Sequence, residues 1–111
     1  MADYKVEITR YAESSMRAIS RYIEFELKSP QAAKNTLQKI SKGIFSLDTF
    51  PERFSLTEEE PWRTEGVRKM LIGNFFVYYW IDNDNHIVRV VDVIYALRKQ
   101  KNALNDVPKN T

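Results

Sequence analysis

Basic side chains gather in the C-terminal half of this sequence, close to tyrosines. Lys69 lies near the start of one apolar run, Tyr95 closes another, and Arg98 follows Tyr95 by three residues. Such cations can neutralise the phosphates of a nucleic acid, and an aromatic ring can stack on a splayed base. They can also stabilise a pentacovalent phosphate, while tyrosine or lysine transfers a proton. We therefore predict Lys69, Arg98 and Tyr95 as candidate catalytic residues for RNA cleavage.

Three more cations lie within or beside the same runs. Arg68 precedes Lys69, Arg89 lies in the last apolar run, and Lys99 follows Arg98. We predict that Arg68, Arg89 and Lys99 bind RNA through its phosphates. The alternative is that all these residues are ordinary surface cations beside core aromatics, because most lysines and arginines are exposed.

Other chemistry has little support in the sequence. The chain has no cysteine, which excludes disulfides and thiolate metal sites. The lone His86 stands beside a polar turn and is expected to be an exposed turn residue. Carboxylates, including the three glutamates at 58–60, are interpreted as turn and surface residues. We expect no metal and no cofactor.

Length and composition point to one globular domain. With 111 residues, 43% hydrophobic and 29% charged, the chain is long enough for one core and unlike a disordered segment. No stretch has the length of a membrane span or the apolar core of a signal peptide. We expect a cytoplasmic protein without membrane contact.

The cations are placed by three predicted strands. Residues 67–72, 75–81 and 86–95 are rich in β-branched and aromatic side chains, and turn-forming residues separate them at 73–74 and 82–85. The short links predict an antiparallel meander. Residues 4–8 alternate charged and apolar side chains and predict a further strand.

Two amphipathic helices are predicted between the first strand and the meander. The first begins near Tyr11 or Ala12, and the second begins after Ser29, which precedes Pro30 as a helix cap. We expect the second helix to end at residues 50–51 and Gly43 to approach the first helix. Their apolar stripes are Ala12, Met16, Ile19 and Ile23, and then Ala33, Leu37, Ile40, Ile44 and Leu47.

These elements predict an α+β fold of order β-α-α-β-β-β. A helical hairpin would pack on one face of a small, mainly antiparallel sheet. The other face would carry Phe76, Tyr78 and Trp80, which alternate along the middle strand. Because a monomer rarely exposes such a row, we predict that a partner or a nucleic acid covers part of it.

The order of elements and the segment VRKMLIGNFFVYYWIDNDNHIVRVVDVIYALRKQ resemble the RelE/ParE superfamily of toxins from type II toxin–antitoxin modules. The opening YKVEITRYAESSMRAISRYI is also similar to the first strand and helix of that family. The resemblance implies a toxin domain over residues 1–99, followed by a polar tail at 100–111. It also implies a cognate antitoxin that binds the toxin in a hetero-oligomer.

The family that the sequence resembles has two activities. RelE-like members cut mRNA on the ribosome, and the resemblance places Lys69 and Arg98 at their basic positions. ParE-like members keep the fold but inhibit DNA gyrase without catalysis. Phe76 aligns with an arginine usual in the nucleases, and Leu104 lies near their C-terminal tyrosine. We expect an mRNA endonuclease with ribosome and mRNA as partners, with gyrase inhibition as the alternative.

Overall fold

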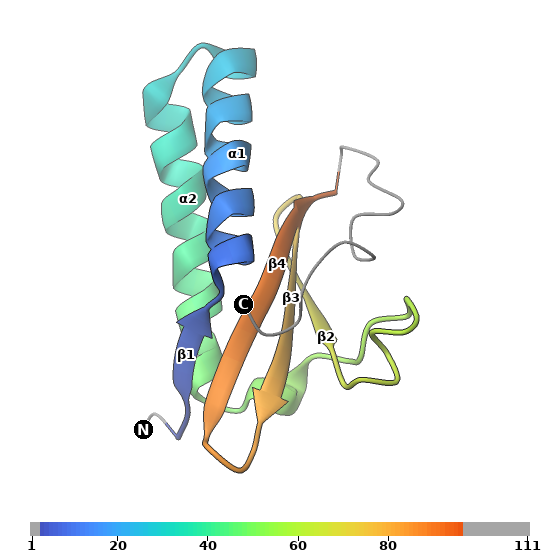
Figure 1. Cartoon of the computed structure of the whole chain (residues 1–111). Helices are drawn as coiled ribbons and strands as arrows, with labels where there is room; N and C mark the ends of the chain where they lie inside the picture. The colour runs from blue at the N-terminus through green and yellow to red at the C-terminus, as the bar shows by residue number, and fades with distance from the viewer. Residues whose placement is uncertain (1–2, 97–111) are drawn as a thin grey trace.

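The computed structural model describes residues 3–96 and has the predicted α+β architecture (Figure 1). The sheet has strand order β1-β4-β3-β2, formed by β1 (Lys5–Ile8), β2 (Arg68–Ile72), β3 (Phe75–Asp82) and β4 (Ile87–Tyr95). The meander is antiparallel, whereas β1 runs parallel to β4. The predicted order of elements is therefore confirmed, and the sheet is mixed.

Both helices lie on one face of the sheet. Helix α1 (Arg10–Leu27) is capped by the Thr9 hydroxyl, which accepts a hydrogen bond from the Ala12 amide at 3.1 Å. Helix α2 (Pro30–Phe45) is capped by Ser29 in the same way. The apolar stripes of both helices pack on β3 and β4. Each helix must bury its stripe, and each strand must bury the apolar residues that alternate along one face, so the two sets cover each other.

The second helix is shorter than predicted. It ends at Phe45, and two single turns of 3₁₀ helix, Ser46–Asp48 and Pro51–Arg53, follow it. The Ser46 hydroxyl donates to the Gly43 carbonyl at 2.5 Å, a local bond that competes with helical pairing. Leu47 is nevertheless fully buried, so the apolar spacing predicted burial correctly but not the helix end.

Gly43 approaches a different element from the one predicted. A Cβ at this position would lie 2.3 Å from Ile72 Cδ1 of β2, not against α1. The absence of a side chain lets α2 lie close to this edge strand.

The second face of the sheet is partly covered by the chain itself. Residues 54–67, hereafter the covering loop, pass beside β2 (Figure 1). Trp62 of this loop packs onto the second face. Trp62 and Val67 pack with Tyr78, Val91 and Ile94 in a second apolar cluster. Tyr78 is only 3% exposed. Of the three residues expected to face a partner, Tyr78 is therefore covered by the chain itself, and contact of Phe76 and Trp80 with a partner stays a prediction.

Candidate functional site

The predicted site residues fall on both faces of the sheet. Lys69 pairs with Tyr78 across β2 and β3, and its Nζ lies 4.4 Å from the centre of the Phe76 ring, so it faces away from the helices. Arg68 is its neighbour in the strand and therefore points to the helix side, opposite Tyr79. The two cations that the sequence placed together cannot contact the same phosphate from one face.

Tyr95 lies on the helix side of the sheet. Its ring stacks on Phe75 with centroids 4.7 Å apart, and it meets the edge of Tyr22 from α1 at 5.9 Å. Lys69 is on the opposite face, so the structure does not bring these two candidate catalytic groups together. Arg98 and Lys99 lie outside the described residues, and their roles stay predictions.

Lys69 is neutralised by a carboxylate of its own chain. Its Nζ lies 3.2 Å from Glu59 Oε1 in the covering loop. Glu59 also accepts hydrogen bonds from the hydroxyls of Thr57 and Tyr78. Partial burial raises the pKa of Glu59, but the bonds from Thr57 and Lys69 outweigh it and lower that pKa overall. Glu59 therefore stays ionised and paired near neutral pH.

Glu59 is the residue that the sequence analysis missed. It was interpreted as one of three surface glutamates, because the segment shows neither helical nor strand periodicity. The structure folds that segment back so that Glu59 reaches β2 and β3. Among the side chains of this segment, the buried Trp62 three residues later helps to fix this direction, but a lone tryptophan in a polar stretch is a weak signal.

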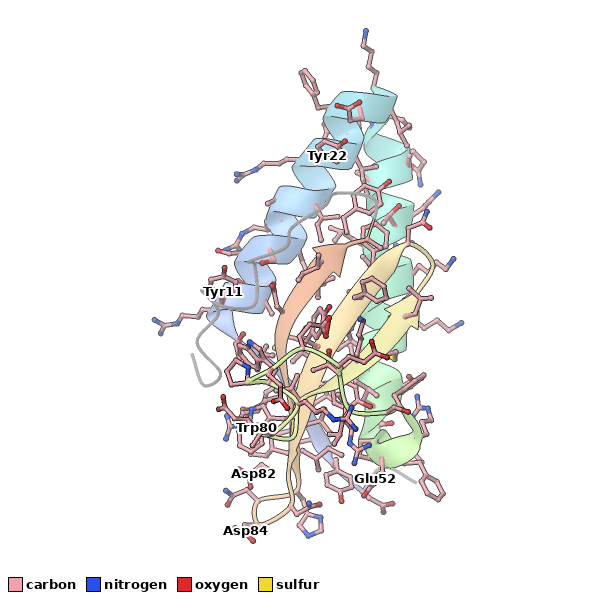
Figure 2. All side chains as sticks on the ribbon, turned by 90° about the vertical axis from the view of Figure 1, so that its right-hand side faces the viewer. Tyr11, Tyr22, Glu52, Trp80, Asp82 and Asp84 are labelled. Carbon is pink, nitrogen blue, oxygen red and sulfur yellow. The ribbon has the colours of Figure 1, made fainter. Side chains whose placement is uncertain are left out.

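Arg89 is also held by carboxylates. It pairs with Trp80 across β3 and β4, and its guanidinium lies 5.9 Å from the Trp80 ring centre. One nitrogen lies 3.0 Å from Glu7 Oε1, and the other lies 3.7 Å from Asp82 Oδ2. Figure 2 shows Trp80 and Asp82 at the same end of the molecule. This cation is thus surrounded by negative charge instead of facing a free surface.

Arg68 forms hydrogen bonds to backbone carbonyl groups. It donates to the Phe54 carbonyl at 2.7 Å and lies 3.4 Å from the Glu52 carbonyl, which ties the covering loop to β2. Each described cation of the predicted RNA site is therefore already engaged by the chain, through carboxylates at Lys69 and Arg89 and through carbonyls at Arg68.

A buried carboxylate lies behind the same face. Asp92 is 2% exposed and accepts a hydrogen bond from the Val93 amide at 2.8 Å. Burial raises the pKa of Asp92 to about 6, although hydrogen bonds from Ser15 and Val93 oppose that rise. Burial also raises the pKa of Tyr78, its partner across the strands, and nearby Glu59 adds to this effect. Neither group is set up as a base for a substrate, because neither is open to solvent.

Among residues 3–96, no three histidine or acidic side chains gather in a way that could hold a metal ion. In the same part of the chain, no helix is long and apolar enough to cross a membrane. The half-exposed surface of the second face is aromatic and aliphatic, formed by Leu71, Phe76 and Trp80 around the covering loop.

Comparison with known proteins identifies the family of this chain and finds solved structures with the same fold. Residues 6–99 match the family described as the ParE toxin of the type II toxin–antitoxin system, parDE. The chain belongs to this ParE toxin family. It is therefore a toxin of a type II toxin–antitoxin system. No curated protein matches the sequence.

Two solved structures share the fold of this family member. A chain from the chromosomal ParDE toxin–antitoxin system of P. aeruginosa superposes with a TM-score of 0.69 at 18% identity, over 84% of this chain and 96% of that one. A chain from the RelBE2 toxin–antitoxin complex of Mycobacterium tuberculosis gives 0.63 at 21% identity, over 86% and 93%. At these identities the likeness establishes the fold.

Proposed function

We propose that this toxin acts without catalysis, by binding and inhibiting DNA gyrase, and that a cognate antitoxin neutralises it in a hetero-oligomer. The observation that carries the proposal is the engagement of Lys69 by Glu59, on the face opposite Tyr95. A phosphate approaching Lys69 would have to displace a carboxylate that is also bonded to Thr57 and Tyr78. This favours the gyrase alternative over mRNA cleavage.

The second face supplies a surface suited to a protein partner. Leu71 is 59% exposed and lies opposite Phe76 on the same face, and Trp80 continues the row. Apolar and aromatic side chains of this kind are typical of the centre of protein interfaces. Phe76 and Trp80 remain predicted contacts for the antitoxin or the target. Tyr78 is buried and would support these two side chains without touching the partner. The solved ParDE and RelBE2 assemblies support an antitoxin as the partner.

The test uses two assays on the same purified chain. In the first, gyrase supercoils a relaxed plasmid with ATP while the toxin is titrated. In the second, a purified translation reaction is followed by primer extension on its mRNA. We expect blocked supercoiling and intact mRNA, and we expect the cognate antitoxin to restore supercoiling.

A matched variant separates the two activities. Lys69→Met removes the charge but keeps the aliphatic length of the side chain, and it should inhibit gyrase within about twofold of the unchanged toxin. Discrete mRNA cuts that disappear in Lys69→Met would overturn the proposal in favour of the endonuclease. Unaffected supercoiling at saturating toxin would also overturn it.

A further inference from the structure

A hollow at the lower end of the molecule is not used by the proposed function. It has a volume of about 380 Å³ and is lined by Asp3, Tyr4, Phe50, Glu52 and His86. These residues come from three places in the chain: the approach to β1, the connection after α2 and the turn before β4. Figure 2 shows Glu52 at the same end of the molecule as Asp82, the last residue of β3, and Asp84 of that turn.

The hollow combines aromatic rings with carboxylates. The rings of Tyr4 and His86 lie 5.4 Å apart at 36°, and the Phe50 ring contributes the third wall. The carboxylates of Asp3 and Glu52 add negative charge, and no lysine or arginine is among the lining residues of the described chain. Within residues 3–96, neither carboxylate is held in an ion pair. This contrasts with Glu7 and Glu59, which are both paired.

The backbone holds two of these rings in an unfavourable conformation. Phe50 has a φ of 52° and His86 a φ of 54°, the left-handed region that non-glycine residues rarely adopt. Phe50 as a residue is 73% exposed, so burial of its side chain does not compensate for this strain. Residues with such strained backbone conformations tend to cluster at the active sites and ligand-binding sites of proteins.

We propose that this hollow binds the guanidinium group of an arginine presented by a partner protein. A planar guanidinium stacks on aromatic faces and donates hydrogen bonds in a fork that matches carboxylates. The two unpaired carboxylates repel phosphates, which argues against a nucleic acid at this end. A surface-exposed site open on one side fits a side chain carried by another protein. The proposal does not depend on whether gyrase is the target.

The test uses the full-length chain and a short probe peptide, acetyl-Gly-Arg-Gly-amide, followed by NMR chemical shifts. The matched control peptide carries citrulline, which keeps the shape of arginine but has no charge. We expect saturable shifts of Phe50, Glu52 and His86 with a millimolar dissociation constant. The citrulline peptide should bind at least fivefold more weakly.

Variants assign the binding to the hollow. Glu52→Gln should weaken arginine binding at least threefold, because it removes charge without changing size. Phe50→Gly should do the same without adding backbone strain, because glycine accepts a positive φ, and an unchanged NMR spectrum away from the hollow would show that the variant is folded. Phe25→Ala removes a 78% exposed ring outside the hollow and should leave the affinity unchanged. Shifts that do not saturate, or equal binding of both peptides, would overturn the proposal.

Discussion

Lys69 and Glu59 form an ion pair on the face of the sheet opposite the helices, with Nζ 3.2 Å from Oε1. The pair joins β2 to the covering loop, and the Phe76 ring lies 4.4 Å from the same ammonium group. One contact therefore ties the covering loop to β2 and neutralises the charge of Lys69.

The strength of this pair can be measured with a double-mutant cycle. We expect Lys69→Met and Glu59→Gln to be coupled by about 0.5 kcal/mol, since both side chains remain partly exposed and screened by water. Urea unfolding of the four proteins gives the coupling. It should shrink in 1 M NaCl. Strictly additive effects at low salt would show that the contact contributes nothing to stability.

Asp92 should make the stability of the fold depend on pH in an unusual direction. Its folded-state pKa of about 6 lies above that of an unfolded aspartate. The native state thus binds the proton more tightly, so the contribution of this group is greatest below about pH 4 and is lost as the pH rises through 6. Glu59 acts in the opposite sense, because its pKa is lowered.

Asp92→Asn isolates this contribution. The unfolding free energy of the variant minus that of the unchanged protein should be larger at pH 7.5 than at pH 4, by on the order of 2 kcal/mol. The asparagine can still accept hydrogen bonds from Ser15 and Val93. Asp84→Asn, in the exposed turn, serves as the control. A difference for Asp92→Asn that is constant with pH would contradict the assignment.

Gly43 and Ile72 should behave as a coupled pair. Alanine at Gly43 gains about 1 kcal/mol of helix propensity, but its Cβ would overlap Ile72 Cδ1, the atom 2.3 Å away. We expect Gly43→Ala to be neutral or destabilising alone and clearly stabilising in the background of Ile72→Val, which lacks that atom. Thermal unfolding of the single and double variants measures the coupling, and additive shifts would refute the close approach.

Removal of Trp62 should loosen the covering loop. The side chain is 5% exposed and packs on Val67 and Tyr78, so Trp62→Ala should destabilise the protein by about 3 kcal/mol. Hydrogen exchange should accelerate at the Thr57 amide, which donates to the Val67 carbonyl at 2.9 Å. Phe25→Ala removes an exposed ring and should change stability by less than about 0.5 kcal/mol. A similarly small effect of Trp62→Ala would show that the loop is not held by this ring.

Most of the fold was predictable because its signals are local. The stripe from Ala12 to Ile23 has helical spacing, and the run from Phe75 onward has the composition of a strand. Ser29 marks the start of the second helix through a hydrogen bond within one turn, whereas the cap at Thr9 was not predicted and the first helix begins slightly earlier than expected. Each of these features depends on residues close in sequence, so the pattern alone determines them.

The site was less predictable because it depends on which face each side chain occupies. Arg68 and Lys69 are adjacent in sequence and therefore lie on opposite faces of β2. The register of β3 and β4 shifts between Tyr78 and Tyr79, so alternation along β4 is interrupted near Val91 and Asp92. Glu59 meets Lys69 only through the path of the aperiodic covering loop. Long-range packing, not local pattern, decides these contacts.

Strand β4 is the last of the described elements to be synthesised, yet it lies in the middle of the sheet. Strand β4 separates β1 from β3. Lys5 of β1 pairs with Ile87 of β4, a residue 82 positions later in the chain. A growing polypeptide that stops before β4 also lacks Val88, Val90 and Val93 of the core. The sheet and its core can therefore be completed only after residues 87–95 have been synthesised, because β1 has no neighbouring strand until β4 exists.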